Sequence, residues 1–354
     1  MRHCNAPMNG TPPLIHTPYP APRRAGWVVY SVIVSILLFI SVFANFIMFA
    51  VVVGPGGGET FHRNLRYQEV FVDGDERARD KIAVIDLVGV IMSEGDGRSG
   101  DGIAADIEDQ LRQAVDDKHV KAIVLRINSP GGEVVASDNI CEAVAGAREE
   151  KPVVANIDSV GASGAYYAAV GANHIIAHEL AITGSIGVIL QSYTFGDLMG
   201  KIGVHSYTFK SGKYKDVLNP TREPTEDEKA LVQSLVLEVY EKFVGVVANE
   251  RHMNVEELKA GLADGRIMSG RQAVESGFVD EVGYFGDAVA KAEELGKIKE
   301  HKVKVIRYVA PFSLRNVFQL FGKSEAPKIQ VELGSSQFKL QSGKLYYLPA
   351  YLFQ

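Results

Sequence analysis

The chain has 354 residues, of which 46% are hydrophobic and 23% charged, a balance that is typical of a globular protein with a sizeable core. Its net charge of −6 provides no basic surface, so nucleic acid is excluded as a main partner. The two cysteines, Cys4 and Cys141, belong to no CxxC or Cys/His cluster, so neither a zinc site nor a disulfide framework is expected.

The first part of the chain predicts a membrane anchor. Residues 1–25 are rich in proline and poor in aliphatic side chains, which favours a disordered tail. Residues 26–53 follow as an apolar run, and Trp27 to Val53 carries no charge. As a helix this run spans about 40 Å, against about 30 Å of bilayer hydrocarbon. A cleavable signal peptide is the nearest alternative, but its apolar region has about 7–15 residues and ends at a small-residue cleavage site that is not evident here.

Basic residues indicate the orientation of this anchor in the lipid bilayer. Arg23 and Arg24 directly precede the apolar run, whereas Arg63 and Arg66 lie farther away on its other side. Arginine and lysine next to a span remain preferentially in the cytoplasm. The sequence therefore predicts a single-pass protein of the cytoplasmic membrane, with a cytoplasmic N-terminus and the remaining chain on the exported side.

The rest of the chain predicts an α/β fold. Residues 54–80 favour a flexible, charged linker, residues 81–323 a folded domain and residues 324–354 a C-terminal extension. Within the domain, strands alternate with helices, which predicts a parallel sheet with right-handed crossovers and flanking helices. The expected strands are 82–91, 122–127, 153–155, 174–177 and 303–309, and the expected helices are 102–115, 134–149, 165–170, 255–262 and 286–295. A capping box at Thr225–Glu228 begins one more long helix, whose buried stripe is expected at Leu231, Leu235, Val239 and Phe243.

Two glycine-rich segments follow predicted strands, Asn128–Gly132 and Gly161–Gly164. Parallel sheets carry their chemistry at the carboxyl ends of strands, where both segments are expected. Ser163 lies between a strand and a helix, with the Gly164 amide next to it, a place that suits a nucleophile. By itself, an N-cap role would explain such a serine more often.

A serine nucleophile needs a base, and two kinds are available. His178 ends the strand after the Ser163 helix, and Asp158 could orient it. Alternatively, Lys210, Lys213 and Lys215 lie around a glycine turn. A lysine acts as a base only when its pKa falls from about 10.4 to near 8, which costs about 3 kcal/mol of differential solvation. Without that effect the three lysines form an ordinary solvated turn.

Four motifs occur in a fixed order: INSPGG at 127–132, ASGAYYAA at 162–169, TGSIGV at 183–188 and KSGKYKDVLNPTRE at 210–223. As a set they resemble the bacterial signal peptide peptidase A family, which are membrane-anchored Ser-Lys proteases of the ClpP/crotonase superfamily. The resemblance covers about residues 80–300 and implies a ClpP/crotonase-like parallel sheet with flanking helices.

The resemblance also implies roles for individual residues. Ser163 corresponds to the nucleophile and Lys215 to its base, while Lys210 and Lys213 have no catalytic role. The amides of Gly132 and Gly164 correspond to the oxyanion hole, and Ser185 to the residue that orients the lysine. No metal or other cofactor is implied.

Long members of this family carry two such domains, and the lysine of one domain serves the serine of the other. A chain with one domain therefore implies a homo-oligomeric ring of about eight protomers whose sites are completed across interfaces. The implied activity is that of a serine endopeptidase acting on remnant signal peptides and other exported or membrane-associated peptides. Two alternatives are a catalytically inactive crotonase-fold scaffold in membrane quality control and a hydrolase that uses His178.

The apolar end of the chain suggests a regulatory role. Leu345–Phe353 could lie in a substrate groove as an extended strand, because peptides often bind by adding a strand to a sheet edge. The alternative is an arm that only packs against the body.

Overall fold

The structure is a computed structural model that describes residues 24–53, 67–93, 102–299, 302–310 and 345–348. Contacts divide the chain after Leu65 into two compact units, which we describe separately. The expected tail before residue 24, the linker over 54–66 and most of the C-terminal extension lie outside the described residues.

The first unit contains helix α1 (Arg24–Val53). Within it, the 22 residues Gly26–Ile47 have a mean hydropathy of 2.5 and are long and apolar enough to cross a membrane. The side chains of this stretch are exposed, so no described part of the protein covers them. The prediction of an apolar N-terminal helix is confirmed, and its length and composition fit a membrane anchor or a signal sequence.

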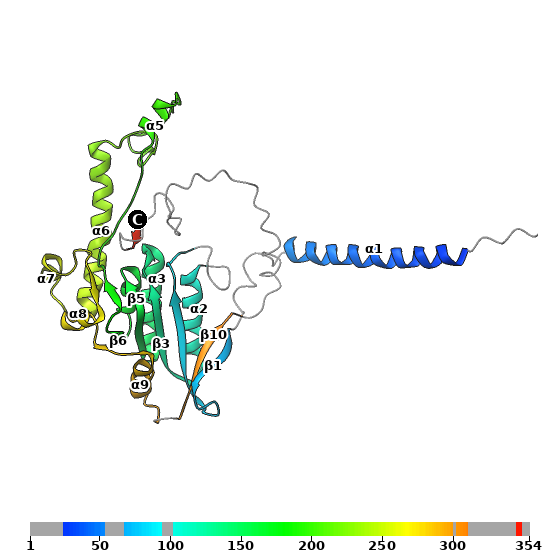
Figure 1. The fold of residues 1–354 in the computed structure, drawn as a ribbon, viewed down its shortest axis with the longest axis horizontal. Coiled ribbons are helices and arrows are strands. Elements are labelled where there is room, and N and C mark those ends of the chain that lie inside the picture. Colours follow the sequence, from blue (N-terminus) through cyan, green and yellow to red (C-terminus); the bar gives the residue numbers. More distant parts are fainter. Residues whose placement is uncertain (1–23, 54–66, 94–101, 300–301, 311–344, 349–354) are drawn as a thin grey trace, which may run out of the picture. The chain divides into compact units, whose positions relative to one another are not determined.

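The second unit is built on one mixed, mostly parallel sheet (Figure 1). In spatial order its strands are β1 (Gln68–Gly74), β10 (Val303–Val309), β2 (Asp80–Val88), β3 (Val120–Ser129), β5 (Val153–Ala162), β6 (His174–Ala177) and β9 (Glu281–Val282). β7 (Ile182–Gly184) pairs with the end of β5 and with β8 (Ile267–Ser269). Among the strands that the structure describes, only the β1/β10 and β7/β8 pairs of this sheet are antiparallel. The predicted α/β class with a parallel sheet is therefore confirmed.

Helices cover both faces of the sheet. The described helices of this unit are α2 (Ile103–Asp116), α3 (Val134–Glu150), α4 (Gly164–Ala169), α5 (Gly196–Lys201), α6 (Glu226–Glu250), α7 (Val255–Ala260), α8 (Gly270–Glu275) and α9 (Phe285–Leu295). Of these, α2, α3 and α4 pack on one face of the sheet and α9 on the other, whereas α5 lies away from the sheet (Figure 1). Along β3, side chains alternate between faces, as the pleat requires. Ile123, Leu125 and Ile127 join the core under α2, α3 and α4, whereas Val124 joins the smaller core under α9.

The register of the sheet aligns the glycine-rich segments. Ser129 at the end of β3 is opposite Gly161 on β5, and Ala162 is opposite Gly184 on β7. Three strands thus end side by side, which confirms that both segments lie at the carboxyl edge. The two glycine-rich segments, one of which contains Ser163, are therefore gathered with Gly184 at one place in the fold.

The structure corrects two predictions about the body. Strand β1 lies inside the stretch that was predicted as a linker, because it adds an antiparallel strand to β10 (Figure 1). The buried stripe of α6 is also only partly as predicted. Phe243 is fully buried, but Leu231 is 37% and Leu235 47% exposed, because the first half of α6 leads away from the sheet (Figure 1).

Candidate active site

Ser163 lies in the tight turn between β5 and α4. Its backbone has φ 54° and ψ −118°, outside the regions that non-glycine residues prefer. The Ser163 amide donates to the Gly184 carbonyl at 2.8 Å, and its own carbonyl accepts from the Tyr167 amide at 2.9 Å. Such backbone conformations cost about 1–3 kcal/mol and concentrate at functional sites. The turn therefore fixes the place of the Ser163 side chain at the cost of local strain.

The Ser163 hydroxyl is buried without a partner. The residue is 1% exposed, and its Oγ makes no hydrogen bond with any residue that the structure describes. It caps no amide of α4, so the N-cap explanation of this serine is wrong. Leaving a buried hydroxyl unpaired costs about 1–3 kcal/mol. Among the described residues, this oxygen therefore makes no hydrogen bond that would help to hold the fold, and its role as nucleophile remains a prediction.

The glycines around Ser163 are required by close backbone approach. A β-carbon on Gly132 would lie 1.9 Å from the Ile91 carbonyl oxygen, and one on Gly164 would lie 2.3 Å from Ser137 Oγ. The Gly132 amide nitrogen lies 3.1 Å from the position that a β-carbon on Gly164 would occupy. The structure therefore brings Gly132 and Gly164 together next to Ser163. Their role as oxyanion donors remains a prediction.

Ser185 reaches the same edge from β7. It follows Gly184, which is opposite Ala162 in the sheet, and it is 5% exposed. Its backbone also has a positive φ of 53°, held by a hydrogen bond of 2.8 Å from the Ser185 amide to the Arg266 carbonyl. Ser185 thus directly follows β7, next to the Ser163 turn, and its role in orienting the lysine remains a prediction.

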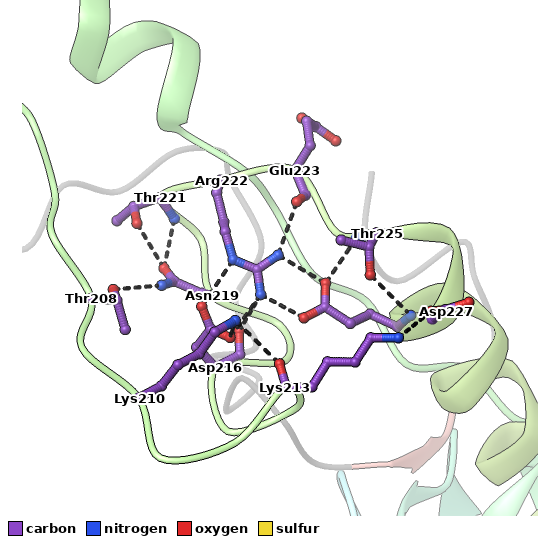
Figure 2. Close-up of polar contacts among 11 residues, drawn as sticks. Thr208, Lys210, Lys213, Asp216, Asn219, Thr221, Arg222, Glu223, Thr225 and Asp227 are labelled. Atoms are coloured by element: carbon purple, nitrogen blue, oxygen red, sulfur yellow. Dashed lines mark hydrogen bonds and ion pairs between the residues drawn. The ribbon is translucent and has the colours of Figure 1, made fainter.

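The three lysines of the glycine turn have different surroundings, and Figure 2 shows Lys210 and Lys213 with their partners. The Lys210 ammonium donates to Asp216 at 2.6 Å, and Lys213 pairs with Asp227, which raises the pKa of Lys213. Lys215 is exposed, and its ammonium makes no hydrogen bond or ion pair with the described residues. Of the three, Lys215 is therefore the one whose ammonium has no carboxylate partner among the described residues. Its role as the base remains a prediction.

Lys215 does not reach Ser163 within one chain. It belongs to a long segment between β7 and α6, residues 190–225, which we call the arm. Since the Ser163 Oγ has no hydrogen-bond partner among the described residues, no hydrogen bond joins it to Lys215. The structure thus gathers Ser163, Gly132, Gly164 and Ser185, and leaves Lys215 apart.

His178 does not serve Ser163 either. Its Nδ1 accepts the Leu180 amide at 3.1 Å, and its ring packs edge-on against Tyr284, with 5.2 Å between ring centroids. Asp158, the residue that could have oriented it, pairs with Arg126 at 2.6 Å. Neither contact points to a Ser-His-Asp arrangement, so the geometry disfavours the histidine alternative.

The end of the chain lies against the candidate site. β11 (Tyr346–Tyr347) pairs antiparallel with β4 (Gly132–Glu133), with Tyr347 opposite Gly132. On its other side, Tyr346 exchanges two backbone hydrogen bonds with Ile189, of 3.1 and 3.2 Å. The described part of the C-terminal segment is therefore an extended strand, held between the two segments that border Ser163. Residues 349–353 lie outside the described part.

The Tyr347 side chain fills an aromatic pocket beside this strand. Its ring centroid is 5.4 Å from that of Tyr167 and 4.6 Å from that of Phe243, and the residue is fully buried. The Tyr347 carbonyl oxygen is 2.3 Å, and the Gly164 amide nitrogen 2.6 Å, from the point that a β-carbon on Gly131 would occupy. A peptide carbonyl thus lies next to the predicted oxyanion donors, with an apolar pocket for the adjoining side chain. The sequence pattern did not reveal this pocket.

Comparisons with known proteins show the family to which the chain belongs. The model of the family described as "Peptidase family S49" matches residues 145–299, which include Ser163, Ser185 and Lys215. A Methanocaldococcus jannaschii protein named "Putative protease" is 38% identical over 232 residues, covering 63% of this chain and 73% of that protein. The chain belongs to peptidase family S49. It is accordingly a member of a family of serine proteases.

For two further relatives of this S49 chain, the match covers a smaller share of the relative's length. The "Putative signal peptide peptidase SppA" of Enterococcus faecium is 40% identical over 55% of this chain and 56% of its own length. The "Serine protease SPPA, chloroplastic" of Arabidopsis thaliana is 34% identical over 70% of this chain and 37% of its own length. The chain thus spans about half, or less, of the length of these two relatives.

Proposed function

We propose that the protein is a serine endopeptidase that uses Ser163 as nucleophile and Lys215 as general base. The Ser163 Oγ attacks the carbonyl carbon of a peptide bond, and its proton passes to the neutral Lys215 amine. The resulting oxyanion accepts hydrogen bonds from the Gly132 and Gly164 amides. Breaking the C–N bond returns the proton to the departing amine, and water then repeats the sequence on the acyl-enzyme. The observation that carries the proposal is the buried, unpartnered Ser163 hydroxyl in a strained turn beside both glycines.

The base, we propose, comes from a neighbouring copy in a homo-oligomeric ring of about eight protomers. Within one chain, Lys215 has no described partner, and neither does the Ser163 hydroxyl. The arm that carries Lys215 exposes large apolar side chains, at Leu198, Ile202, Tyr207 and Phe209, with Phe209 97% exposed. Apolar side chains gathered on one segment typify an interface between proteins. Docking of the arm on the next copy would cover them and deliver the lysine.

A mixing experiment tests both proposals together. Ser163→Ala and Lys215→Ala proteins are each expected to be inactive in hydrolysis of an apolar peptide. If they are co-expressed and assemble at random, about a quarter of the sites combine an intact serine with an intact lysine from the neighbour. Recovery of about a quarter of the wild-type rate supports the shared site. No recovery after verified co-assembly means that both residues act within one chain, and activity of Lys215→Ala alone refutes the base.

The proposed substrates are remnant signal peptides and other exported or membrane-associated peptides. The support is the apolar helix α1, which we propose to be a retained anchor with its N-terminus in the cytoplasm, together with the aromatic pocket around Tyr347. The Enterococcus relative carries the name of such a peptidase. Mass spectrometry of membrane peptides that accumulate with Ser163→Ala tests the assignment. Accumulation of cytoplasmic peptides alone contradicts it.

A fluorophosphonate probe separates this proposal from the inactive-scaffold alternative. Such probes phosphorylate activated serines, so the wild-type protein should be labelled at Ser163 and the Ser163→Ala protein should not. An unlabelled wild-type assembly would favour the scaffold.

A further inference from the structure

Arg222 lies in the arm between Lys215 and the start of α6, and its guanidinium binds on both sides (Figure 2). Toward the lysine turn, Nε donates to Asp216 Oδ2 at 2.9 Å and Nη2 donates to the Asp216 carbonyl at 3.1 Å. Toward the helix, Nη1 and Nη2 donate to the two carboxylate oxygens of Glu228 at 2.8 and 2.5 Å. Such forked pairs combine charge with a fixed geometry.

Glu228 is itself held firmly. It is 2% exposed and forms the capping box of α6, where its carboxylate also accepts the Thr225 amide at 2.8 Å. The far half of α6 packs into the core through Phe243. Arg222 therefore connects the residue next to Lys215, through Glu228, to a helix that is anchored in the body.

Cations around the lysine turn pair with three of its acids, Asp216, Asp227 and Glu228. Asp216 accepts both Arg222 and Lys210, Glu228 accepts Arg222, and Lys213 is paired with Asp227. Lys215 directly precedes Asp216 in the chain, yet it makes no ion pair among the described residues. The cluster thus keeps the carboxylate that is nearest to Lys215 in sequence occupied by other cations.

We propose that Arg222 is a positioning residue for the reaction. It fastens the turn of Lys215 to α6, and it withholds the Asp216 carboxylate from the Lys215 ammonium. This inference rests on the proposed role of Lys215 as the base.

Its consequence follows from simple electrostatics. Without Arg222, the Asp216 carboxylate keeps only Lys210, on Oδ1, as a cationic partner, and its Oδ2 becomes free to pair with Lys215. An adjacent negative charge favours the protonated amine, so the base would become neutral only at higher pH. Loss of the tie to α6 would also let the turn move, and a small misplacement of a catalytic group lowers the rate strongly.

The test is the pH dependence of kcat/KM for Arg222→Gln in the full-length, assembled protein. The limb that reflects deprotonation of the base should move up by about one pH unit, and the rate at neutral pH should fall about tenfold. Arg222→Lys should restore part of the rate, because an ammonium keeps the charge but not the fork. In the double variant with Asp216→Asn, the limb should return toward its wild-type position, since the amide carries no charge.

Arg251 provides a matched control. Its guanidinium also donates to a backbone carbonyl, that of Gly277 at 3.0 Å, and to the carboxylate of Asp280 at 2.7 Å, but it contacts no residue of the arm. Arg251→Gln should therefore lower the melting temperature without moving the pH profile.

The outcomes separate this inference from the proposed function. A wild-type rate and profile in Arg222→Gln overturns the positioning role, and so does a rate that falls equally at every pH with a lower melting temperature. A pH limb that is shifted in Arg222→Gln and returns toward the wild-type position when Asp216→Asn is added supports the inference. Lys215→Ala in the same assay reports on the base itself, because its activity would refute the proposed function whatever Arg222 does.

Discussion

The carboxyl edge of the sheet and the arm solve the problem of placing a reactive side chain in opposite ways. At the edge, Ser163 is fixed by strands that are buried on both faces and by glycines that admit no side chain. In the arm, Lys215 is exposed and lies in a turn that ion pairs hold to α6. Hydrophobic burial makes the first region rigid without a partner, whereas the second depends on charges that water and salt weaken.

Under the proposed function, the half of the candidate site that holds the nucleophile is complete in a single chain, and the base comes from a neighbouring copy. A nucleophile and its oxyanion donors must be held within tenths of an ångström, which a packed sheet edge provides. The base must be neutral, and an exposed lysine meets that condition only after an apolar surface covers it. We propose that the exposed apolar side chains of the arm dock on a neighbouring copy, and that this contact excludes water from Lys215. The contrast between the two regions can be tested by breaking each in turn.

The largest effect is expected from removing the reactive groups. Ser163→Ala and Lys215→Ala should each lower kcat at least about 10³-fold, because neither the attack nor the proton transfer can then occur. Their stabilities should differ. Ser163→Ala removes an unpaired buried hydroxyl and should raise the free energy of unfolding by about 1 kcal/mol, whereas Lys215→Ala should leave it unchanged. Denaturant unfolding and peptide hydrolysis measure the two quantities.

Lys213→Ala is the matched control, since it removes a neighbouring lysine that is paired with Asp227. It should retain activity within a few-fold. Loss of activity in Lys213→Ala together with wild-type activity in Lys215→Ala would show that the base had been assigned to the wrong lysine.

The next effect is expected from crowding the rigid edge. In Gly164→Ala, the new methyl group would lie 2.3 Å from Ser137 Oγ, so the turn must move or Ser137 must yield. We expect a loss of about 1–3 kcal/mol in stability and a fall of about 10²-fold in kcat, because the Gly164 amide is displaced from the oxyanion. Gly146→Ala on α3, where nothing lies within 4 Å, should instead stabilise the fold by about 0.5–1 kcal/mol.

Adding Ser137→Ala to Gly164→Ala should recover part of the lost activity by removing the clashing oxygen. If Gly164→Ala alone retains the wild-type rate, the Gly164 amide takes no part in catalysis.

A smaller change is expected from removing residues 345–354. β11 lies between Gly132 and Ile189, where a substrate strand would pair, and a tethered segment competes at high effective concentration. The deletion should raise kcat/KM for a short peptide roughly tenfold, while loss of the buried Tyr347 ring lowers stability by about 2 kcal/mol. Tyr347→Ala in the intact chain separates the pocket from the strand. An unchanged rate with lowered stability means that the segment is only a packing arm.

The sequence predicted the rigid region far better than the arm. The strand at His174–Ala177 and the one at Val303–Val309 have the predicted bounds, because a buried parallel strand is a continuous apolar run between breaks. The motif resemblance also led to Ser163, Gly132, Gly164 and Ser185, which the fold then gathered. Local patterns could not place β1, whose alternation is short and mostly exposed, and which is defined by pairing with a strand that lies far away in the chain.

The exposed first half of α6 and the ion pairs of the arm escaped prediction for a related physical reason. Leu231 and Leu235 have helical spacing that normally indicates a core stripe, and an apolar face awaiting another protein has the same spacing as one that is buried in its own chain. The ion pairs of Arg222 were equally hidden, since charged residues near a turn usually form a solvated surface. Only coordinates reveal which carboxylates such an arginine meets.

The smallest effect is expected from acid, and it should reach the arm before the sheet. Arg222 and Lys210 hold the pKa of Asp216 well below its usual range, and the hydrogen bonds from Arg222 lower the pKa of Glu228 to about 2. Carboxylates with lowered pKa values stabilise the folded state fully above the ordinary carboxyl pKa near 4, and this stabilisation is lost as the pH falls through the folded values. Between about pH 5 and pH 2, hydrogen exchange corrected for its intrinsic rate should therefore speed up in the arm and at the start of α6 while β3 stays protected.

The control is Arg222→Gln. In this variant the exchange should be fast already at pH 5, since the pairing of residue 222 with Asp216 and Glu228 is gone at every pH. Equal loss of protection in β3 and the arm would mean that the ion pairs do not hold the arm separately, and the contrast between the two regions would then fail.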